Sequence, residues 1–316
     1  MKIWIINNTK FGYKNNSKEW SNNMFDYFDN EFLPLLTKQY KSDDIVVHLG
    51  NVFNNSENLN TKILNRTIDL FERISNICTL YLMVGHNDRV NDNNINTFKA
   101  LEKHKNIEIV KDCLNLIHKD KKIKLISWCN NPLKHMTSDI NLVNIELLKI
   151  DERLLKKGKI YCGYYDDKKL LGNCTLVGSP YQFNDSNDKG IYIIDVENNK
   201  DIFISNKKSP VYKTIEINEI EEIEVIDEDF VNKNNVNILI NKKLIETKEI
   251  KTKILLSKYN FKKIDYFDSG TEEIEELSDN TSTTIEKMIR DKIKNSDNKI
   301  LLSEFENIIK IYKDKY

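Results

Sequence analysis

Residues 43–76, DDIVVHLGNVFNNSENLNTKILNRTIDLFERISN, carry the pattern on which the interpretation of the whole chain depends. The mostly apolar run from Ile45 to His48 is typical of a buried strand, and the polar pair Gly50 and Asn51 follows it closely. After a polar turn, apolar residues recur at helical spacing from Asn58 to Ile74. The stretch therefore predicts a strand, a turn with polar side chains, and an amphipathic helix.

Three further polar segments come just after apolar runs in the same way. They are NNTK at Asn7 to Lys10, GHND at Gly85 to Asp88 and GYYD at Gly163 to Asp166. Between these runs, Glu19 to Leu36 carries another apolar stripe at helical spacing. Short strands that alternate with long amphipathic segments predict an α/β layered architecture.

From about Lys105 onward the expected strands come close together, which predicts a second sheet stacked on the first. These strands are expected at Ile107 to Val110, Leu114 to His118, Ile123 to Ser127, Lys159 to Cys162, Cys174 to Val177, Ile191 to Val196 and Asp201 to Ile204.

In order and framing, the four polar segments resemble the GDxH, GD, GNHD and GHxH motifs of the calcineurin-like phosphoesterases. The resemblance is closest to the nuclease subunit of recombination and break-repair complexes, called SbcD in bacteria, and especially to its phage counterpart. Residues 43–76 look like that family's second metal motif with its helix, and CTLVGSPYQFNDSNDKGIYIIDVE at 174–197 is similar to the turn and strand after its last histidine motif. Over residues 1–215 the resemblance implies a two-sheet metallophosphoesterase sandwich flanked by helices.

The resembled family binds two manganese or magnesium ions at these motifs, but the matching positions here carry other residues. They are Asn8, Lys10, Asn51, His86, Asn87, Tyr164 and Asp166. Two adjacent divalent cations need anionic bridging ligands, whereas an amide oxygen is neutral and a lysine ammonium has no lone pair. We therefore expect neither a two-metal centre nor catalytic residues at this site.

Some alternatives remain open at the site. A weak single-metal site using His86, Asp166 and Asn51 is conceivable. Lys10 is expected either to fill the emptied cavity and pair with Asp166 or Asp88, or to be a solvated loop lysine. His48 is expected to be a structural hydrogen-bond partner. No counterpart of the family's middle histidine motif is found between Trp128 and Leu155, where His135 is the one histidine.

Composition restricts the classes of function. Charged residues make up 31% of the 316 residues and the formal net charge is −1, so no global charge indicates a polyanionic partner. The basic stretches Lys119 to Lys124 and Lys156 to Lys159 are typical of solvated faces, and near the site they could contact phosphates. The five cysteines have no metal-ligand spacing, which favours reduced thiols and a cytoplasmic location. No apolar stretch reaches the ~20 residues that span a bilayer, so no membrane partner is expected.

The composition changes beyond Tyr212. Residues 216–268 predict a small α/β capping domain, residues 269–283 an acidic linker, and residues 284–316 two amphipathic C-terminal helices. In the resembled family this last part docks on the coiled-coil base of an SMC-like ATPase, called SbcC in bacteria, although folding back on its own domain is the alternative. The expected partner-contact residues are Ile285, Met288, Ile289, Leu302, Phe305, Ile308, Ile309 and Tyr312.

Three functions follow from these expectations. The first is an SbcD-like architectural subunit of a DNA recombination or double-strand-break processing complex, with an inactive nuclease site and with double-stranded DNA and an SMC-like ATPase as partners. The second is an active metal-dependent DNA exonuclease or endonuclease with an atypical site. The third is an inhibitor or decoy that binds a host break-repair complex. Whether the chain pairs with itself or with an active paralogue is left open.

Overall fold

The structure is a computed structural model that describes residues 1–90, 95–128, 135–136, 139–146, 158–184, 188–244, 251–252, 255–259 and 261–267. The chain divides into two compact units, Met1–Phe267 and Asp268–Tyr316. The acidic linker expected at 269–283 and the helices expected at 284–316, with their partner-contact residues, lie outside the described residues.

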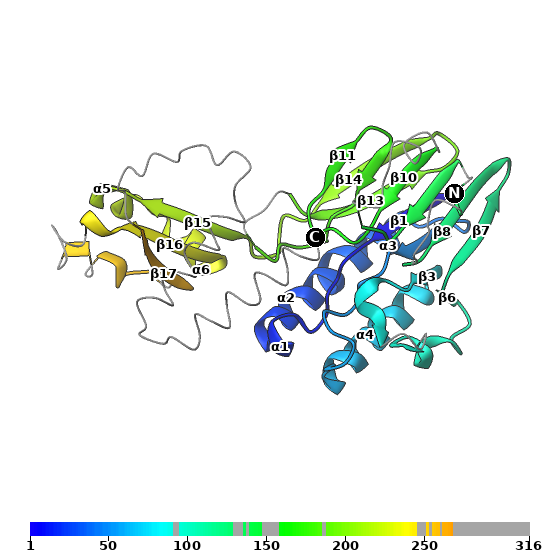
Figure 1. The fold of residues 1–316 in the computed structure, drawn as a ribbon, viewed down its shortest axis with the longest axis horizontal. Helices are drawn as coiled ribbons and strands as arrows, with labels where there is room; N and C mark the ends of the chain where they lie inside the picture. The colour runs from blue at the N-terminus through cyan, green and yellow to red at the C-terminus, as the bar shows by residue number, and fades with distance from the viewer. Residues whose placement is uncertain are drawn as a thin grey trace, which may run out of the picture. The chain divides into compact units, whose positions relative to one another are not determined.

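Six strands form the first sheet, in the order β14-β13-β1-β2-β3-β6 (Figure 1). The four strands β1, β2, β3 and β6 run parallel, and β13 and β14 are antiparallel additions at one edge. Their bounds are β1 Lys2–Ile6, β2 Ile45–His48, β3 Thr79–Met83, β6 Ile107–Val110, β13 Gly190–Asp195 and β14 Lys200–Ser205.

The second sheet also has six strands, in the order β11-β12-β10-β9-β8-β7. The four central strands are parallel, while β7 and β11 pair antiparallel at the two edges. The strands are β7 Cys113–His118, β8 Lys121–Ile126, β9 Ile140–Val143, β10 Lys159–Cys162, β11 Lys169–Leu171 and β12 Cys174–Leu176. Sequence patterns missed β9, whose apolar run is interrupted by Asn141, and β11, which has only the apolar pair Leu170 and Leu171.

The two sheets stack face to face, as predicted. One core cluster joins Ile5 and Val47 of the first sheet to Leu125, Leu142 and Tyr161 of the second. These side chains are at most 1% exposed. Because alternate residues of a strand point to opposite faces, the other face of the first sheet is left for the helices.

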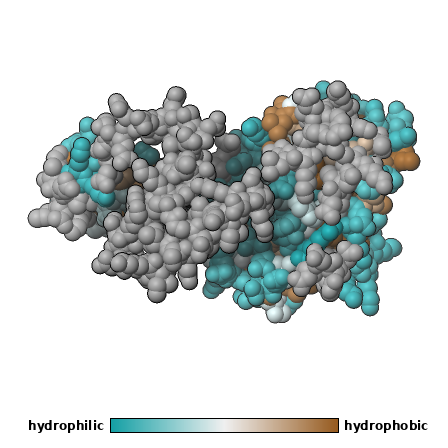
Figure 2. All heavy atoms as spheres, in the orientation of Figure 1, coloured by the Kyte–Doolittle hydropathy of each residue, from teal (hydrophilic) through white to brown (hydrophobic). Residues whose placement is uncertain are grey.

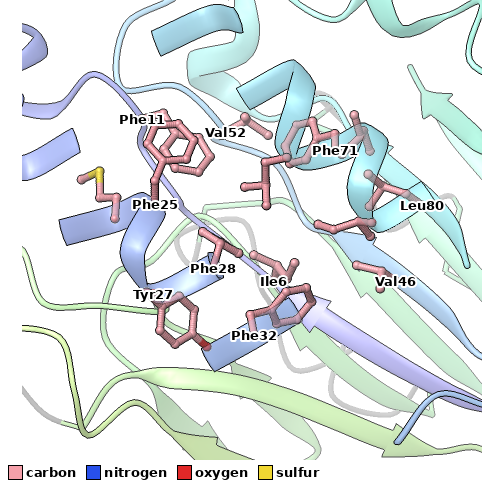
Figure 3. Packing of buried hydrophobic residues seen from close by; sticks show 14 of the residues in the cluster. Ile6, Phe11, Phe25, Tyr27, Phe28, Phe32, Val46, Val52, Phe71 and Leu80 are labelled. Atoms are coloured by element: carbon pink, nitrogen blue, oxygen red, sulfur yellow. The ribbon is translucent and has the colours of Figure 1, made fainter. Parts of the chain in front are cut away.

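Helices cover that outer face. They are α2 Lys18–Tyr27, a π-helical turn at Phe28–Phe32, α3 Leu33–Gln39 and α4 Thr61–Ser75. Phe11 and Phe25 stack with ring centroids 4.5 Å apart, and Phe28 and Phe32 pack beneath them against β1 (Figure 3). The helix expected from Asn58 begins three residues later, because the Asn60 side chain accepts the Lys62 N–H as its N-cap.

Short elements connect these layers. They are α1 Tyr13–Asn16, the 3₁₀ turns His86–Asp88 and Lys99–Leu101, and the strand pair β4 Arg89–Val90 and β5 Ile95–Asn96. The 3₁₀ turn His86–Asp88 comes soon after the end of β3 and contains most of the third polar segment.

A separate three-stranded parallel sheet follows, in the order β15-β16-β17. Its strands are β15 Tyr212–Ile217, β16 Asn235–Asn241 and β17 Lys263–Phe267, with α5 Ile220–Glu224 and α6 Glu228–Lys233 between the first two. This sheet has its own apolar cluster, which includes Ile217, Ile220, Ile238 and Ile240. Ile217 ends β15 and Ile220 lies in α5, so the strands and the short helices share this apolar cluster.

The surface of the described residues is largely hydrophilic on the visible face, and its apolar patches are small (Figure 2). Among the described residues no helix is both long and apolar enough to cross a membrane. The exposed large hydrophobic side chains are Ile117, Leu170, Ile202, Val225, Ile264 and Tyr266.

The core between α4 and the first sheet generates a stability prediction. Phe71→Ala should lower the free energy of unfolding by about 3–5 kcal/mol, because this side chain is 1% exposed and its removal leaves a cavity. Lys62→Ala on the exposed side of the same helix is the matched control and should change it by less than ~0.5 kcal/mol. Urea unfolding followed by circular dichroism measures both, and equal losses in the two variants would contradict this packing.

Candidate functional site

The polar segments converge where strands of both sheets end. Asn7 to Lys10 follow β1, Asn51 follows β2 and Gly85 to Asp88 follow β3, all in the first sheet. Gly163 to Asp166 follow β10 of the second sheet. Hydrogen bonds then link the segments directly, so the site lies at one end of the two-sheet stack and contains residues from both layers.

Three asparagines form a continuous chain of hydrogen bonds through this site. The Asn87 backbone N–H donates to the Asn51 amide oxygen at 3.1 Å, and the Asn51 amide donates to the Asn8 oxygen at 2.9 Å. The Asn8 amide in turn donates to Oδ1 of Asp166 at 3.1 Å. Asn8 and Asn51 are buried, so each amide finds its partners within the protein. This relay places donors where the resembled family has metal ligands.

Lys10 completes the relay at Asp166. Its Nζ lies 2.6 Å from Oδ2 of Asp166, and the two side chains are 18% and 32% exposed. The pairing expected from the sequence is therefore present, and the alternative of a solvated loop lysine is wrong. One carboxylate oxygen accepts from an amide and the other from an ammonium, so Asp166 has both oxygens engaged without any metal.

A buried lysine fixes the loop that carries Asp166. Lys189 is 4% exposed, and its Nζ donates to the Asp166 carbonyl at 2.5 Å and to Oδ1 of Asp167 at 2.7 Å. Charge-assisted bonds of this kind are among the stronger hydrogen bonds in proteins. Sequence patterns missed Lys189, because a single lysine just before a strand gives no periodic signal.

Asp88 has a structural role that differs from the one expected. It is fully buried, and its two oxygens accept the backbone N–H groups of Gly85, Asn51, Val52 and Phe53 at 2.7–3.3 Å. Of the two partners expected for Lys10, the structure therefore has Asp166 and not Asp88. Burial raises the pKa of Asp88 to about 6, against the opposing effect of the four N–H donors. Asp88 ties the loop after β2 to the loop after β3.

His48 is a structural residue, as predicted. Its ring is fully buried, and Nδ1 accepts the Gly50 N–H at 3.1 Å while Nε2 lies 3.0 Å from the Thr9 hydroxyl. The Thr9 hydroxyl donates to the Val52 carbonyl, so Nε2 carries the proton that Thr9 accepts. Burial lowers the pKa of His48 to about 3, which keeps the ring neutral.

His86 lies at the outer side of the site among aromatic rings. Its side chain is exposed, with Nδ1 3.1 Å from Oδ1 of Asn87, and its ring meets the edge of Trp128 at 4.9 Å. Tyr164 stacks on Trp128 at 5.2 Å with a φ of 79°, which is unusual for a bulky side chain. His86, Trp128 and Tyr164 thus form an aromatic group at the outer side of the site.

These residues do not fit a metal centre. Among the described residues no group of three or more His, Cys, Asp or Glu side chains is placed to hold a metal ion. For the single-metal set of His86, Asp166 and Asn51, the Asn51 oxygen already accepts the Asn87 N–H and both Asp166 oxygens are engaged. A cation would have to break these bonds and displace the Lys10 ammonium.

Sequence reasoning missed two further asparagines that join the sheets. Asn144 follows β9, and its buried amide donates to the Leu49 carbonyl after β2 at 2.7 Å. Asn7 follows β1 and donates to the Gly178 carbonyl at 3.0 Å. A single asparagine directly after a short apolar run was the available signal for Asn144. His135 was the histidine considered in this stretch, and its Nδ1 lies 3.8 Å from Sγ of Cys113.

Comparison with known proteins identifies no family. No protein-family model matches the chain, and no curated protein matches it. One similar solved structure is a protein of unknown function, AQ665 from Aquifex aeolicus, at 18% identity and a TM-score of 0.29. The alignment covers 45% of this chain and 77% of that one. This similarity is too low to support any statement about fold or function.

The Asp88 clamp generates the prediction for the site. Asp88→Asn should lower the free energy of unfolding at pH 8 by about 2–3 kcal/mol, because two of the four buried N–H groups would face an NH₂ group instead of an acceptor. Asp26→Asn, on the exposed face of α2, removes the same charge and should change stability by less than ~0.5 kcal/mol. Chemical denaturation of both variants provides the measurement.

The pH dependence of this effect has a defined sign. Since the pKa of Asp88 is raised to about 6, the folded protein binds the proton more tightly than the unfolded chain does. The free energy of unfolding of the wild-type protein should therefore rise, relative to Asp88→Asn, as the pH falls from about 6 to about 4. A wild-type advantage that shrinks over this interval would contradict the assignment.

Proposed function

We propose that the chain is an SbcD-like, calcineurin-like phosphoesterase that has lost its metal chemistry and serves as an architectural subunit of a DNA recombination or double-strand-break processing complex. The observation that supports the proposal is the contact between Lys10 and Asp166 at 2.6 Å within the amide relay. A hydrogen-bonded and charge-neutral network stands at the strand ends where that family holds two cations.

Charge balance supports the loss of the metal centre. Asp166 and Lys10 cancel each other, and the other members of the relay, Asn8 and Asn51, are neutral. The remaining nearby carboxylate, Asp88, is already engaged by four backbone N–H groups. Among these groups, two divalent cations would therefore face one net negative charge, that of Asp88, which is too little to offset their mutual repulsion.

The architecture is compatible with the proposal at the level of its layers. Two stacked six-stranded sheets with helices outside the first sheet agree with an α/β class, and the metallophosphoesterase sandwich is the finer interpretation that we propose. The small sheet β15-β16-β17 then corresponds to the capping domain. The proposed partners are an SMC-like coiled-coil ATPase and double-stranded DNA, and the proposed location is cytoplasmic.

Restoring carboxylates alone should not restore nuclease activity. Asn8→Asp with Asn51→Asp would place two carboxylates where a 2.9 Å amide hydrogen bond now lies, while Lys10 would keep its ammonium beside Asp166. We expect no manganese-dependent cleavage of linear DNA and a lower melting temperature without metal. The matched variant adds Lys10→His, which removes the fixed positive charge and supplies a lone pair.

Calorimetric titration with manganese separates the possible results of this experiment. The wild-type protein and the double variant should give no heat of binding at the site, and the triple variant should bind more tightly than either. Cleavage by the wild-type protein in manganese, or two tightly bound ions per chain, would contradict the architectural role and favour an active enzyme.

The proposed ATPase contact is tested through the C-terminal segment. Deleting residues 280–316 should abolish co-purification with the coiled-coil ATPase, because burying several apolar side chains at ~1.5–3 kcal/mol each would supply the binding free energy. Phe305→Ala with Ile309→Ala should weaken the complex, whereas Glu306→Ala with Asn307→Ala, in the same segment, should not. Circular dichroism should show that each variant remains folded. Co-purification of the truncated chain would exclude this docking mode.

A further inference from the structure

A cavity of about 740 Å³ lies within the unit Met1–Phe267, and the amide relay is not part of its lining. One part of the lining comes from α1 and the start of α2, and another from Phe183 and Asn184. The rest comes from the first residues of β15 and from residues in or next to β16 and β17. The volume falls within the range of about 300–1,000 Å³ that is typical of small-molecule sites. None of its lining residues belongs to the four polar segments.

Aromatic rings form one wall of this cavity. Trp20 stacks on Tyr212 with centroids 4.9 Å apart and planes 15° apart, and on Phe183 at 5.9 Å and 16°. Tyr13 places its ring against Trp20 at 4.8 Å and against Phe183 at 4.7 Å. Trp20 is nearly buried, whereas Tyr13 and Tyr212 are half-buried and border the open space. The wall therefore presents flat apolar surface that is already ordered before any ligand arrives.

The rest of the lining is strongly basic. Lys14, Lys213, Lys262 and Lys263 line the cavity together with one acidic residue, Glu19. Lys262 pairs with Glu19 at 2.9 Å, and Lys263 pairs with Asp265 at 2.6 Å.

The two remaining lysines carry the excess positive charge. Among the residues that the structure describes, no acidic side chain forms an ion pair with Lys14 or Lys213, and both are exposed. The Lys14 Nζ lies 5.4 Å from the centre of the Trp20 ring and 5.8 Å from that of Tyr212. Charge and aromatic surface thus coincide at one side of the cavity.

The backbone of α1 around Lys14 has an unusual, non-helical conformation. Lys14, Asn15 and Asn16 all have φ between 49° and 62°. The Asn16 amide donates to the Asn58 carbonyl at 3.1 Å, and its oxygen accepts the Asn60 N–H at 3.3 Å. Consecutive left-handed residues are costly without glycine, so the anchoring by Asn16 fixes the position from which Lys14 reaches the aromatic wall.

We propose that this cavity binds a segment of single-stranded nucleic acid, with a base against the aromatic wall and adjacent phosphates at Lys14 and Lys213. Paired aromatic and cationic groups are the combination that recognises unpaired bases and their backbone, and duplex DNA keeps its bases stacked and unavailable. The two free lysines suit a chain with repeated phosphates better than a single nucleotide. The proposal extends the proposed role but does not depend on it, since no residue of the amide relay takes part.

Fluorescence anisotropy on the full chain tests the proposal with a labelled oligothymidylate. Lys14→Ala with Lys213→Ala should weaken binding by about tenfold or more and should lower the slope of log affinity against log salt by about 1.4, at ~0.7 for each lost phosphate contact. Both side chains are exposed, so the variant should keep the wild-type melting temperature. The matched control, Lys103→Ala with Lys105→Ala, removes two exposed lysines elsewhere and should leave the affinity unchanged.

A second arm separates base stacking from charge. An abasic oligonucleotide of equal length carries the same phosphates and should bind about tenfold more weakly, since stacking on an aromatic side chain contributes ~1–3 kcal/mol per base. A mononucleotide and a duplex of equal length should also bind more weakly than oligothymidylate. The proposal would be overturned if the two double-lysine variants lost the same affinity, or if the abasic strand bound as tightly as oligothymidylate. Tighter binding of the mononucleotide or the duplex would also overturn it. Metal-dependent cleavage would contradict the architectural role and leave this site unaffected.

Discussion

Lys10 and Asp166 meet at 2.6 Å between loops that belong to different sheets, and the polar end of the two-sheet stack is organised around this ion pair. Both side chains are partly buried, so each charge is better stabilised in the pair than alone. The amide relay then ends on the remaining Asp166 oxygen. An ionised carboxylate can only accept hydrogen bonds, so the Asn8 amide must donate to Asp166. The Asn8 oxygen is then left to accept from the Asn51 amide.

Amides and ion pairs both connect the two sheets elsewhere, and one of the ion pairs joins Lys159 of β10 to Asp201 of β14 at 3.2 Å. Asn7 and Asn144 cross between the layers and donate to backbone carbonyls, while Asp88 draws together two loops of the first sheet. Each of these contacts satisfies a backbone or side-chain group that burial would otherwise leave unpaired. The strand ends are therefore tied by many neutral bonds of modest individual strength, and the apolar layer between the sheets supplies the larger part of the stability.

Different parts of this arrangement were predictable from the sequence to different degrees. The stacked sheets and the helices α2 and α4 followed from strong periodicity, and Lys10 with Asp166 followed from motif positions. The strand β9 was missed because Asn141 and Asn144 interrupt the apolar run Ile140 to Ile145. Asp88 was considered as a partner of Lys10, because a carboxylate in a polar segment suggests an available charge. Only the fold shows that four backbone N–H groups are directed at it. Residue type indicates what a group can do, and the backbone around it determines what it does.

The hydrogen bonds of the amide relay all run in one direction, from the Asn87 N–H through Asn51 and Asn8 to Asp166. In such a chain each amide polarises the next, so the members are coupled rather than independent. A single change from asparagine to aspartate would reverse one donor and leave its neighbour facing an acceptor. A single substitution in the relay is therefore expected to lower the stability of the protein, and a metal site designed at these positions would need several residues to change together.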